Sequence, residues 1–312
     1  MSSPENELGE ARTLVDLLEF RAGAASDRTA FYFLQHGETA SAPLKASQLR
    51  MHARRIALQL RESVSPGDRA LLLFPPGLEF IAAFFASLYA GVIAVPCYPP
   101  KRNRFDTRVQ AIVKDAQPAI ALAPASVIEE LRDRQSVAFG DRDLKWLAAD
   151  ISDRGTGDPT DARPDSGWTY PEIQPERLAF LQYTSGSTST PKGVMVSHGN
   201  LMANLRDLDL GLRHDPESVL VTWLPTFHDM GLIYGVLMPV YRGFKCYMMP
   251  PTAFLRRPWL WLDVISRFRG THSAAPNFAY DACVNSVTTE HQACLDLRSW
   301  QCSANAAEPV RE

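Results

Sequence analysis

Two short apolar runs, joined by a segment of helical length, constrain the fold of this chain more than any other feature. Ala70–Phe74 is apolar at every position, which is typical of a strand buried on both faces of a sheet. A helix is predicted over Leu78–Ala90, and Gly91 after it is the residue type that most often ends a helix. Val92–Val95 then predicts a second buried strand. This order requires a parallel pair of strands joined by a helical crossover.

The same alternation continues through most of the chain. Helices are predicted over residues 12–21, 44–60, 107–115, 126–134, 201–210, 231–241, 258–267 and 278–286. Strands are predicted over residues 30–34, 119–123, 178–183, 219–223, 245–249, 271–274 and 300–304. Alternating helices and buried strands predict an α/β fold with largely parallel sheets flanked by helices. In such folds, ligands bind beyond the carboxyl ends of the strands.

A change of composition near the middle of the chain divides it. Residues 151–176 are rich in Gly, Pro, Asp and Thr, which is typical of a surface linker. A chain of 312 residues is long enough to form two subdomains. We therefore predict a first α/β subdomain over 1–150, a linker over 151–176, and a second α/β subdomain over 177–312 that is incomplete at its carboxyl end.

The composition argues against several classes of protein. The hydrophobic fraction is 46% and the formal net charge is −3, so neither disorder nor a face that binds nucleic acid is expected. The amino-terminal residues do not resemble a secretory signal, and the most apolar run, 81–95, is too short to cross a bilayer. Five widely spaced cysteines favour reduced thiols over a zinc site. We expect a cytoplasmic protein without a transmembrane segment or a metal site of its own.

A loop rich in hydroxyl groups is the strongest functional signal. Residues 184–190 are Thr-Ser-Gly-Ser-Thr-Ser-Thr, and Pro191-Lys192-Gly193 follows before another short apolar strand. Small hydroxyl side chains, accessible backbone N–H groups and a single cation suit a polyphosphate. The spacing is not that of a Walker A loop, because Pro191 precedes the lysine and Gly193 follows it. A flexible linker would explain the composition, but it would need neither Pro-Lys-Gly nor flanking strands, so we favour a phosphate-binding loop.

Four segments in series resemble the adenylate-forming superfamily, which includes acyl-CoA ligases and nonribosomal-peptide adenylation domains. The segments are residues 183–198, 224–232, 275–280 and 305–310. Most members carry Gly where this chain has Ser189. The form Ser-Thr-Ser-x-Pro-Lys-Gly is instead similar to that of the fatty acyl-AMP ligases, which supply polyketide and lipopeptide assembly lines. The resemblance covers the whole chain and implies the fold of the N-terminal domain of these enzymes.

The resemblance implies roles for three groups of residues. The residues expected to hold the β- and γ-phosphates of ATP are Thr184, Ser185, Gly186, Ser187, Thr188 and Lys192. The residues expected to lie against the adenine are Asn305, Ala306, Ala307 and Glu308. The residues expected to line an apolar tunnel for an acyl chain are Met230, Gly231, Leu232, Asn277, Phe278 and Ala279. By composition alone the adenine segment is an ordinary turn, and each tunnel residue could instead pack in the core.

His228 is the candidate catalytic residue. It follows a predicted strand and a proline turn, and the resemblance implies that it contacts the substrate carboxylate or the α-phosphate, or gates the acyl channel. The alternative is that it only begins a helix, with Asp229 as the amino-terminal cap. Its order relative to the other motifs favours the functional interpretation.

The function that the resemblance implies is ATP-dependent activation of a fatty acid to acyl-AMP, with release of pyrophosphate. The acyl group would pass to the phosphopantetheine thiol of an acyl-carrier protein, or of a carrier domain in a polyketide or nonribosomal peptide synthase. An acyl-CoA ligase and a catalytically inactive nucleotide- or acyl-binding module are the alternatives. Family members continue past the position of residue 312 with the magnesium ligand, the ribose ligand and a mobile C-terminal domain. We therefore expect a fragment without that domain, inactive on its own, whose Mg²⁺ ligand lies beyond residue 312.

Overall fold

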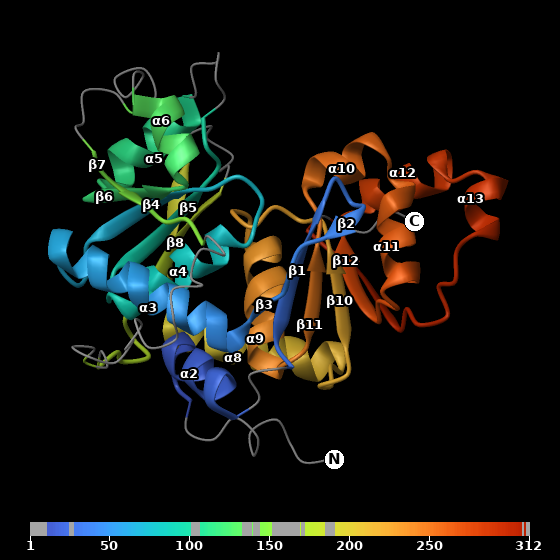
Figure 1. The fold of residues 1–312 in the computed structure, drawn as a ribbon, viewed down its shortest axis with the longest axis horizontal. Helices are drawn as coiled ribbons and strands as arrows, with labels where there is room; N and C mark the ends of the chain where they lie inside the picture. The colour runs from blue at the N-terminus through green and yellow to red at the C-terminus, as the bar shows by residue number, and fades with distance from the viewer. Residues whose placement is uncertain are drawn as a thin grey trace. The chain divides into compact units, whose positions relative to one another are not determined.

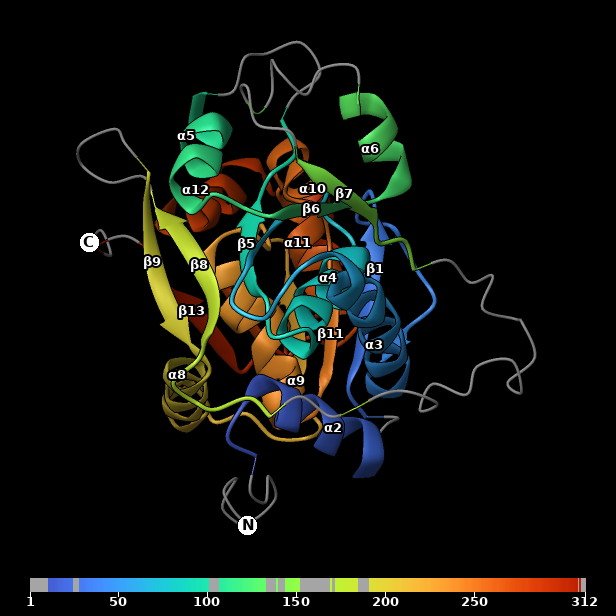
Figure 2. The same cartoon turned by 90° about the vertical axis from the view of Figure 1, so that its left-hand side faces the viewer.

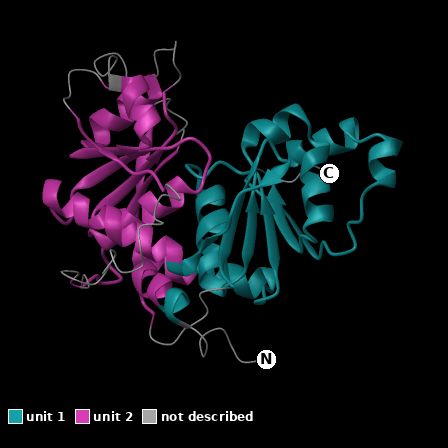
Figure 3. Ribbon diagram, in the orientation of Figure 1, with its two compact units in different colours: residues 1–8, 20–47, 204–312 teal, residues 9–19, 48–203 magenta. Residues whose placement is uncertain are grey.

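The computed structural model describes residues 11–24, 28–100, 107–132, 139, 144–151, 169, 172–184, 191–307 and 309. These residues form two compact units, which are coloured separately in Figure 3. Described residues of 20–47 and 204–312 form unit 1, and those of 9–19 and 48–203 form unit 2. Each unit is built around one sheet (Figure 1).

Unit 2 contains a six-stranded sheet in the order β7-β6-β4-β5-β8-β9. Its strands are β4 (Arg69–Leu73), β5 (Ile93–Cys97), β6 (Ile120–Ala123), β7 (Lys145–Ala148), β8 (Leu178–Thr184) and β9 (Lys192–Ser197). All neighbouring pairs are parallel except β8 and β9, which lie side by side as an antiparallel pair at one edge (Figure 2). The helices of this part of the chain are α2 (Leu14–Ala24), α3 (Ala46–Ser63), α4 (Glu79–Tyr89), α5 (Thr107–Ala116) and α6 (Ala125–Arg132).

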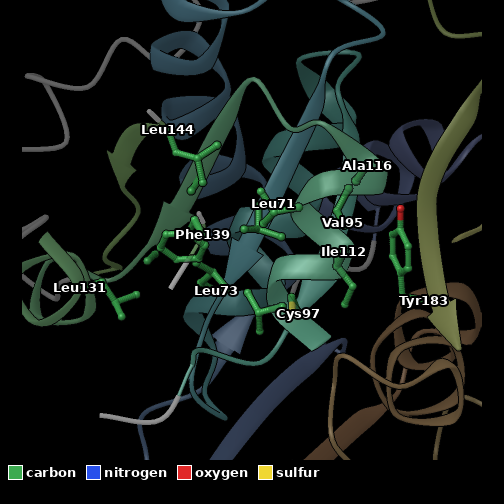
Figure 4. Packing of buried hydrophobic residues seen from close by; sticks show 14 of the residues in the cluster. Leu71, Leu73, Val95, Cys97, Ile112, Ala116, Leu131, Phe139, Leu144 and Tyr183 are labelled. Atoms are coloured by element: carbon green, nitrogen blue, oxygen red, sulfur yellow. The ribbon is translucent and has the colours of Figure 1, made fainter. Parts of the chain in front are cut away.

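The predicted strand–helix–strand unit is confirmed as β4, α4 and β5, and it forms much of the interior of unit 2. Leu71 of β4 pairs in parallel with Val95 of β5, and both side chains are fully buried. The α4 helix is buried at every position from Phe80 to Tyr89, as expected for a helix that is apolar all round. Figure 4 shows the core cluster on which α5 packs, with Ile112 facing this core and Tyr183 of β8 at its edge.

Unit 1 contains a seven-stranded sheet in the order β13-β12-β10-β11-β1-β2, with β3 also paired to β1. Its strands are β1 (Ala30–Gln35), β2 (Thr39–Ala40), β3 (Leu44–Lys45), β10 (Val219–Thr222), β11 (Lys245–Met248), β12 (His272–Ala275) and β13 (Cys302–Asn305). The pairs among β13, β12, β10, β11 and β1 are parallel, whereas β2 and β3 are antiparallel to β1. The predicted α/β class with largely parallel sheets is therefore confirmed.

Helices lie on both faces of this sheet, with α9 on one side and α11 on the other (Figure 1). The helices are α8 (His198–Leu212), the π-helix η1 (Met230–Leu237), α9 (Met238–Arg242), α10 (Pro251–Arg256), α11 (Trp259–Arg267), α12 (Asn277–Ser286) and α13 (Thr289–Ala293). On the α11 side the core is aromatic: Trp223 stacks on Phe254 with ring centroids 4.0 Å apart, and Trp261 meets Trp223 edge-on. This packing holds the carboxyl ends of the strands in place.

Three differences from the predicted elements have physical explanations. The single helix predicted over 231–241 is a π-helix followed by α9, and Pro239 stands in the first turn of α9, where its missing N–H is not needed. The strand β7 and the helices α10 and α13 were not predicted, and each is only four to six residues long. The strands β8 and β9 follow the predicted linker in the sequence but share a sheet with β4–β7, so the compact units do not follow the predicted division.

Across the described ranges, no helix is both long enough and apolar enough to cross a membrane.

Candidate functional site

A pocket of about 520 Å³ lies within unit 1 beside the carboxyl ends of β12 and β13. Its walls come from α8, from the start of η1 and the two residues before it, and from the two strands and the segment after β13. The lining residues are Asn204, Leu208, Leu212, His228, Asp229, Met230, Ile233, Tyr234, Ala274, Ala304, Ala306 and Ala307. A volume of this size is typical of a small-molecule site.

The side walls of the pocket are mainly apolar. Leu208 and Leu212 stand four residues apart on α8 and therefore share one helix face. Ala274 and Ala304 are direct partners across the β12–β13 pair, and their methyl groups leave space where larger side chains would fill it. This part of the pocket is suited to the hydrocarbon portion of a ligand.

One end of the pocket carries a polar pair, His228 and Asp229. The His228 Nδ1 atom lies 2.6 Å from Asp229 Oδ1, and the two side chains are 54% and 53% exposed. The same carboxylate accepts a 2.6 Å hydrogen bond from the backbone N–H of Met230 and so caps η1. The hydrogen bond from His228 is the main cause of the lowered pKa of Asp229. Asp229 is thus the amino-terminal cap that belonged to the alternative interpretation, and its carboxylate also fixes the His228 ring, with Nε2 on the edge away from Asp229.

A tight turn holds His228 in this place. The His228 N–H donates to the Pro225 carbonyl at 3.0 Å, and the His228 carbonyl accepts from the Leu232 N–H at 2.8 Å. A Cβ atom on Gly231 would lie 2.1 Å from the Pro225 carbonyl oxygen. Only glycine permits this approach of two backbone segments. The role of Gly231 in the structure is therefore to let η1 begin directly under the turn.

The segment after β13 is held by a side-chain amide. Asn277, which is only 6% exposed, donates from Nδ2 to the Pro309 carbonyl at 2.6 Å and accepts at Oδ1 from Asn305 Nδ2 at 2.6 Å. Between these two points lie Ala306, whose N–H donates to the Ala275 carbonyl, and Ala307, whose φ is +75°. Asn277 thus ties the segment that lines the pocket to the start of α12.

The structure brings four predicted residues together in this pocket: His228, Met230, Ala306 and Ala307. Among the described residues, the lining does not include the other predicted tunnel residues. Leu232 and Ala279 are fully buried, Ala279 within the aromatic core, and Phe278 is 47% exposed against the rings of Trp223 and Phe254. The site contains other residues that the motifs did not indicate: Asn204, Leu208, Leu212, Ile233, Tyr234, Ala274 and Ala304.

The two described ends of the predicted phosphate loop belong to unit 2. Ser185, Gly186, Ser187 and Thr188 lie outside the described residues, as does Glu308 of the predicted adenine segment. Thr184 and Lys192 are described, and they face each other as the last register pair of the β8–β9 hairpin. The predicted strands on both sides of the loop are thereby confirmed.

Tyr183, which precedes Thr184 in β8, fixes the end of this hairpin that is nearest the loop. Its hydroxyl donates to Asp115 Oδ2 at 2.5 Å, and burial together with that bond raises the pKa of the phenol. Gly193 stands opposite Tyr183 in the register, where a Cβ would lie 2.9 Å from the Tyr183 ring. The glycine of Pro-Lys-Gly therefore makes room for an aromatic ring, and this places Lys192 at the loop end of the strand.

The described residues contain no cluster of three or more His, Cys, Asp or Glu side chains that could hold a metal ion. The one carboxylate of the pocket lining, Asp229, is already bonded to His228 and to the backbone. The described part of the pocket therefore does not fit a magnesium ion held by this chain's side chains.

Comparison with known proteins relates this geometry to a family. Residues 18–312 match the family described as AMP-binding enzyme. The chain is 44% identical to the medium-chain-fatty-acid (acyl-carrier-protein) ligase JamA of Moorena producens, over all of this chain and 51% of that protein. It is 37% identical to the long-chain-fatty-acid AMP ligase FadD26 of Mycobacterium marinum, over 92% of this chain and 49% of that protein.

A solved structure gives the same result. The fatty acyl-adenylate ligase from L. pneumophila, crystallised with acyl adenylate and pyrophosphate, matches with a TM-score of 0.88 and 40% identity, over 100% of this chain and 52% of that chain. The chain spans about half the length of the curated relatives it matches. The parallel sheets and the apolar pocket at the strand ends are those of a ligand-binding α/β protein. More particularly, the chain belongs to the family of AMP-binding enzymes, and the predicted resemblance to fatty acyl-AMP ligases is confirmed.

Proposed function

We propose that this chain supplies the fatty-acid and nucleotide sites of a ligase that converts a fatty acid and ATP to acyl-AMP and pyrophosphate. In this reaction a carboxylate oxygen attacks the α-phosphorus, a carboxyl–phosphate bond forms, and the bond to the β-phosphate breaks. The observation that carries the proposal is the pocket of unit 1, in which an apolar wall leads to a His–Asp pair and to two alanines after β13.

Each part of the pocket suits one part of an acyl-adenylate. The leucines of α8 and the Ala274–Ala304 pair suit the hydrocarbon chain, because burial of each methylene is worth about 0.8 kcal/mol. Ala306 and Ala307 offer a flat backbone surface for the adenine. His228 lines the same pocket with one ring nitrogen held by Asp229, and we assign its imidazole to the carboxylate or the α-phosphate.

The phosphate loop of unit 2 completes the proposal. Thr184 and Lys192 at the loop end of the β8–β9 hairpin would hold the β- and γ-phosphates together with the hydroxyl-rich residues between them. A lysine there would stabilise the negative charge that moves onto pyrophosphate as it leaves. We also place Mg²⁺ in the reaction, where it would neutralise phosphate charge; the described residues hold no cluster of three or more His, Cys, Asp or Glu side chains for it.

The acceptor of the acyl group is the second half of the proposal. We propose the phosphopantetheine thiol of an acyl-carrier protein or of a carrier domain in a polyketide or nonribosomal peptide synthase; the thiol attacks the acyl carbonyl and AMP leaves. The name of JamA, an acyl-carrier-protein ligase, supports this choice. We also propose a cytoplasmic location, because the wide spacing of the five cysteines is typical of reduced thiols.

The binding half of the proposal is testable with the 312-residue chain. A stable mimic of the product, an acyl chain joined to adenosine through a sulfamoyl group, is titrated calorimetrically against adenosine and against the free fatty acid. We expect the mimic to bind more tightly than either part. Equal affinity for the mimic and for adenosine alone would refute the assignment of the apolar pocket to an acyl chain.

The acceptor is tested in a protein of the relatives' full length that contains these residues. With fatty acid and ATP-Mg²⁺, we expect acyl-AMP to accumulate with free CoA, and the acyl group to leave only when a phosphopantetheinylated carrier protein is added. Formation of acyl-CoA would assign the protein to the acyl-CoA ligases instead. Absence of acyl-AMP under all conditions would favour a catalytically inactive binding module.

A further inference from the structure

The pocket closes at its inner end because one register pair of β12 and β13 has small side chains and the next pair on the same face has larger ones. Ala274 and Ala304 are register partners and both line the pocket. Two residues earlier on each strand, and so on the same face, stand the partners His272 and Cys302, which are not among the lining residues. A strand rises about 3.3 Å per residue. The larger side chains of His272 and Cys302 therefore occupy this face of the sheet about 7 Å before the two alanines along the strands.

The side chain that reaches this level from the opposite wall is Tyr234. It belongs to η1, it is 4% exposed, and it is one of the lining residues. Its hydroxyl lies 3.2 Å from His214 Nε2, and burial, followed by the Cys302 thiol, raises the pKa of its phenol. Leu212 beside it accepts a hydrogen bond at its carbonyl from His272 Nε2 at 3.0 Å. Tyr234 and Leu212 therefore lie at the floor of the pocket, opposite the end that carries His228.

Behind this floor, Tyr234 is held by a buried polar network. The His214 ring stacks on His272 with centroids 4.5 Å apart and on Phe244 at 5.3 Å. Its Nδ1 atom lies 3.4 Å from Asp209 Oδ1, and the two side chains are 0% and 3% exposed. Arg242 places Nε 3.8 Å from the same carboxylate oxygen and donates to the His214 carbonyl at 3.1 Å.

Such a network is a costly way to fill a core. Desolvation of buried charges offsets most of their mutual attraction, and well-packed apolar side chains of equal volume are often at least as stable. What the network adds is direction: the Nδ1 edge of the His214 ring faces Asp209, and its Nε2 edge faces the Tyr234 hydroxyl. The phenol is thereby fixed in one orientation, which an apolar neighbour could not enforce.

We propose that Tyr234 sets the maximum length of the acyl chain that the pocket accepts, and that His214 and Asp209 are positioning residues that hold it there. This inference rests on the proposed function, since it assigns the pocket to an acyl chain. A chain that enters with its carboxylate at His228 meets the Tyr234 ring at its far end. Removal of the ring would open the space toward Cys302 and His214.

The experiment is a chain-length profile of binding to the 312-residue chain. Straight-chain acyl sulfamoyl adenosines that differ by two methylenes are titrated calorimetrically into the wild type, Tyr234→Leu and Tyr234→Phe. The control is Leu210→Ala, a substitution on α8, which also lines the pocket, at a side chain that is 63% exposed. The wild type should gain affinity with length up to a limit and then lose it sharply, and Leu210→Ala should have the same limit.

Tyr234→Leu should move the limit to longer chains. The first mimic that the wild type rejects should bind the variant at least about tenfold more tightly, the value of two further buried methylenes. Tyr234→Phe keeps the ring and loses only the bond to His214, so the limit should stay at the same length while the rejection beyond it weakens. A role confined to stability would lower the melting temperature of these variants without changing the profile.

The outcomes separate this inference from the proposed function. If the wild type binds the series but Tyr234→Leu and Tyr234→Phe retain its limit and its sharpness, the inference is wrong and the acyl pocket stands. If no mimic binds the wild type more tightly than adenosine does, the proposed function fails and the inference fails with it. Should Tyr234→Leu not fold, the loss or retention of sharp rejection in Tyr234→Phe still decides.

Discussion

Replacement of Gly231 by alanine should dismantle the turn that carries His228. The new Cβ would lie 2.1 Å from the Pro225 carbonyl oxygen and 2.6 Å from its carbonyl carbon, whereas real Cβ atoms essentially never approach closer than 3.0 Å. Both obstructing atoms belong to the backbone and cannot rotate away. Pro225 and η1 must therefore separate by about 1 Å, and the hydrogen bond from the His228 N–H to the Pro225 carbonyl must lengthen or break.

The magnitude follows from three contributions. Overpacking of this kind costs about 1–3 kcal/mol, and loss of the His228 hydrogen bond adds about 1 kcal/mol. Replacement of a glycine in a helix stabilises the protein by about 0.5–1 kcal/mol, because the unfolded chain then has less conformational entropy to lose. The net loss of unfolding free energy for Gly231→Ala is then about 1–3 kcal/mol, or roughly 2–4 °C of melting temperature per kcal/mol for a domain of this size.

The matched control is Gly211→Ala. Gly211 lies in α8, where a Cβ would meet nothing within 4 Å, so this variant keeps the entropic gain without the clash. Thermal unfolding should show Gly211→Ala slightly stabilised and Gly231→Ala destabilised, and binding of the acyl sulfamoyl adenosine should be lost only in Gly231→Ala. Equal stability and equal binding of the two variants would show that the turn does not position His228.

Three further outcomes are expected. Lys192→Ala should weaken binding of ATP by about 1.5–3 kcal/mol, the value of one charge-assisted hydrogen bond. The control Lys245→Ala, at an exposed lysine, should leave the affinity measured by calorimetry unchanged. Equal affinity of both variants for ATP would argue against the phosphate loop. Asn277→Ala removes the hydrogen bonds to Pro309 and Asn305 and should weaken binding of adenosine about tenfold. Unchanged affinity of this variant for adenosine would show that the segment after β13 keeps its conformation without Asn277. Burial lowers the pKa of His198 to about 4, below its ordinary 6.5, so the unfolded chain takes up the proton first. Its stabilising contribution, about 3 kcal/mol, should be complete above pH 6.5 and be lost as the pH falls toward 4, and His198→Gln should flatten that part of a chemical-denaturation profile against pH; an unchanged slope would contradict this.

The fold could be predicted to the extent that local patterns define it. The runs that became β4 and β5 are apolar at nearly every position, and the helix between them ends at Gly91, so each element carries its own signal. The sharing of one sheet by β8 and β4 could not be predicted, because strand order depends on contacts between segments far apart in the sequence. The π-helix was missed for a related reason, since an apolar segment with two glycines also matches an α-helix.

The site could be predicted only where one motif contains several of its residues. His228 and Met230 belong to one motif, and Ala306 and Ala307 belong to another, and all four residues line the pocket. The spacing of Asn204 and Leu208 on the predicted helix, continued by Leu212 two residues beyond its predicted end, was a signal that could have been used. Tyr234 had no such signal, because its place at the floor depends on the register of β12 against β13.

The discontinuity of unit 1 has a consequence for how the protein is made. Strand β1 pairs with β11, and Arg21 donates to the Val240 carbonyl across a separation of 219 residues. At about 5–20 residues per second, a ribosome takes at least about ten seconds to synthesise the partner of β1 after β1 itself has emerged. Throughout that interval Phe31 and Leu34, fully buried in the finished sheet, have only the two-residue strands β2 and β3 beside them and lack β11. The nascent chain is thus exposed to aggregation and to chaperone binding at its amino-terminal end, and a piece made from residues 204–312 alone would lack a central strand of its own sheet.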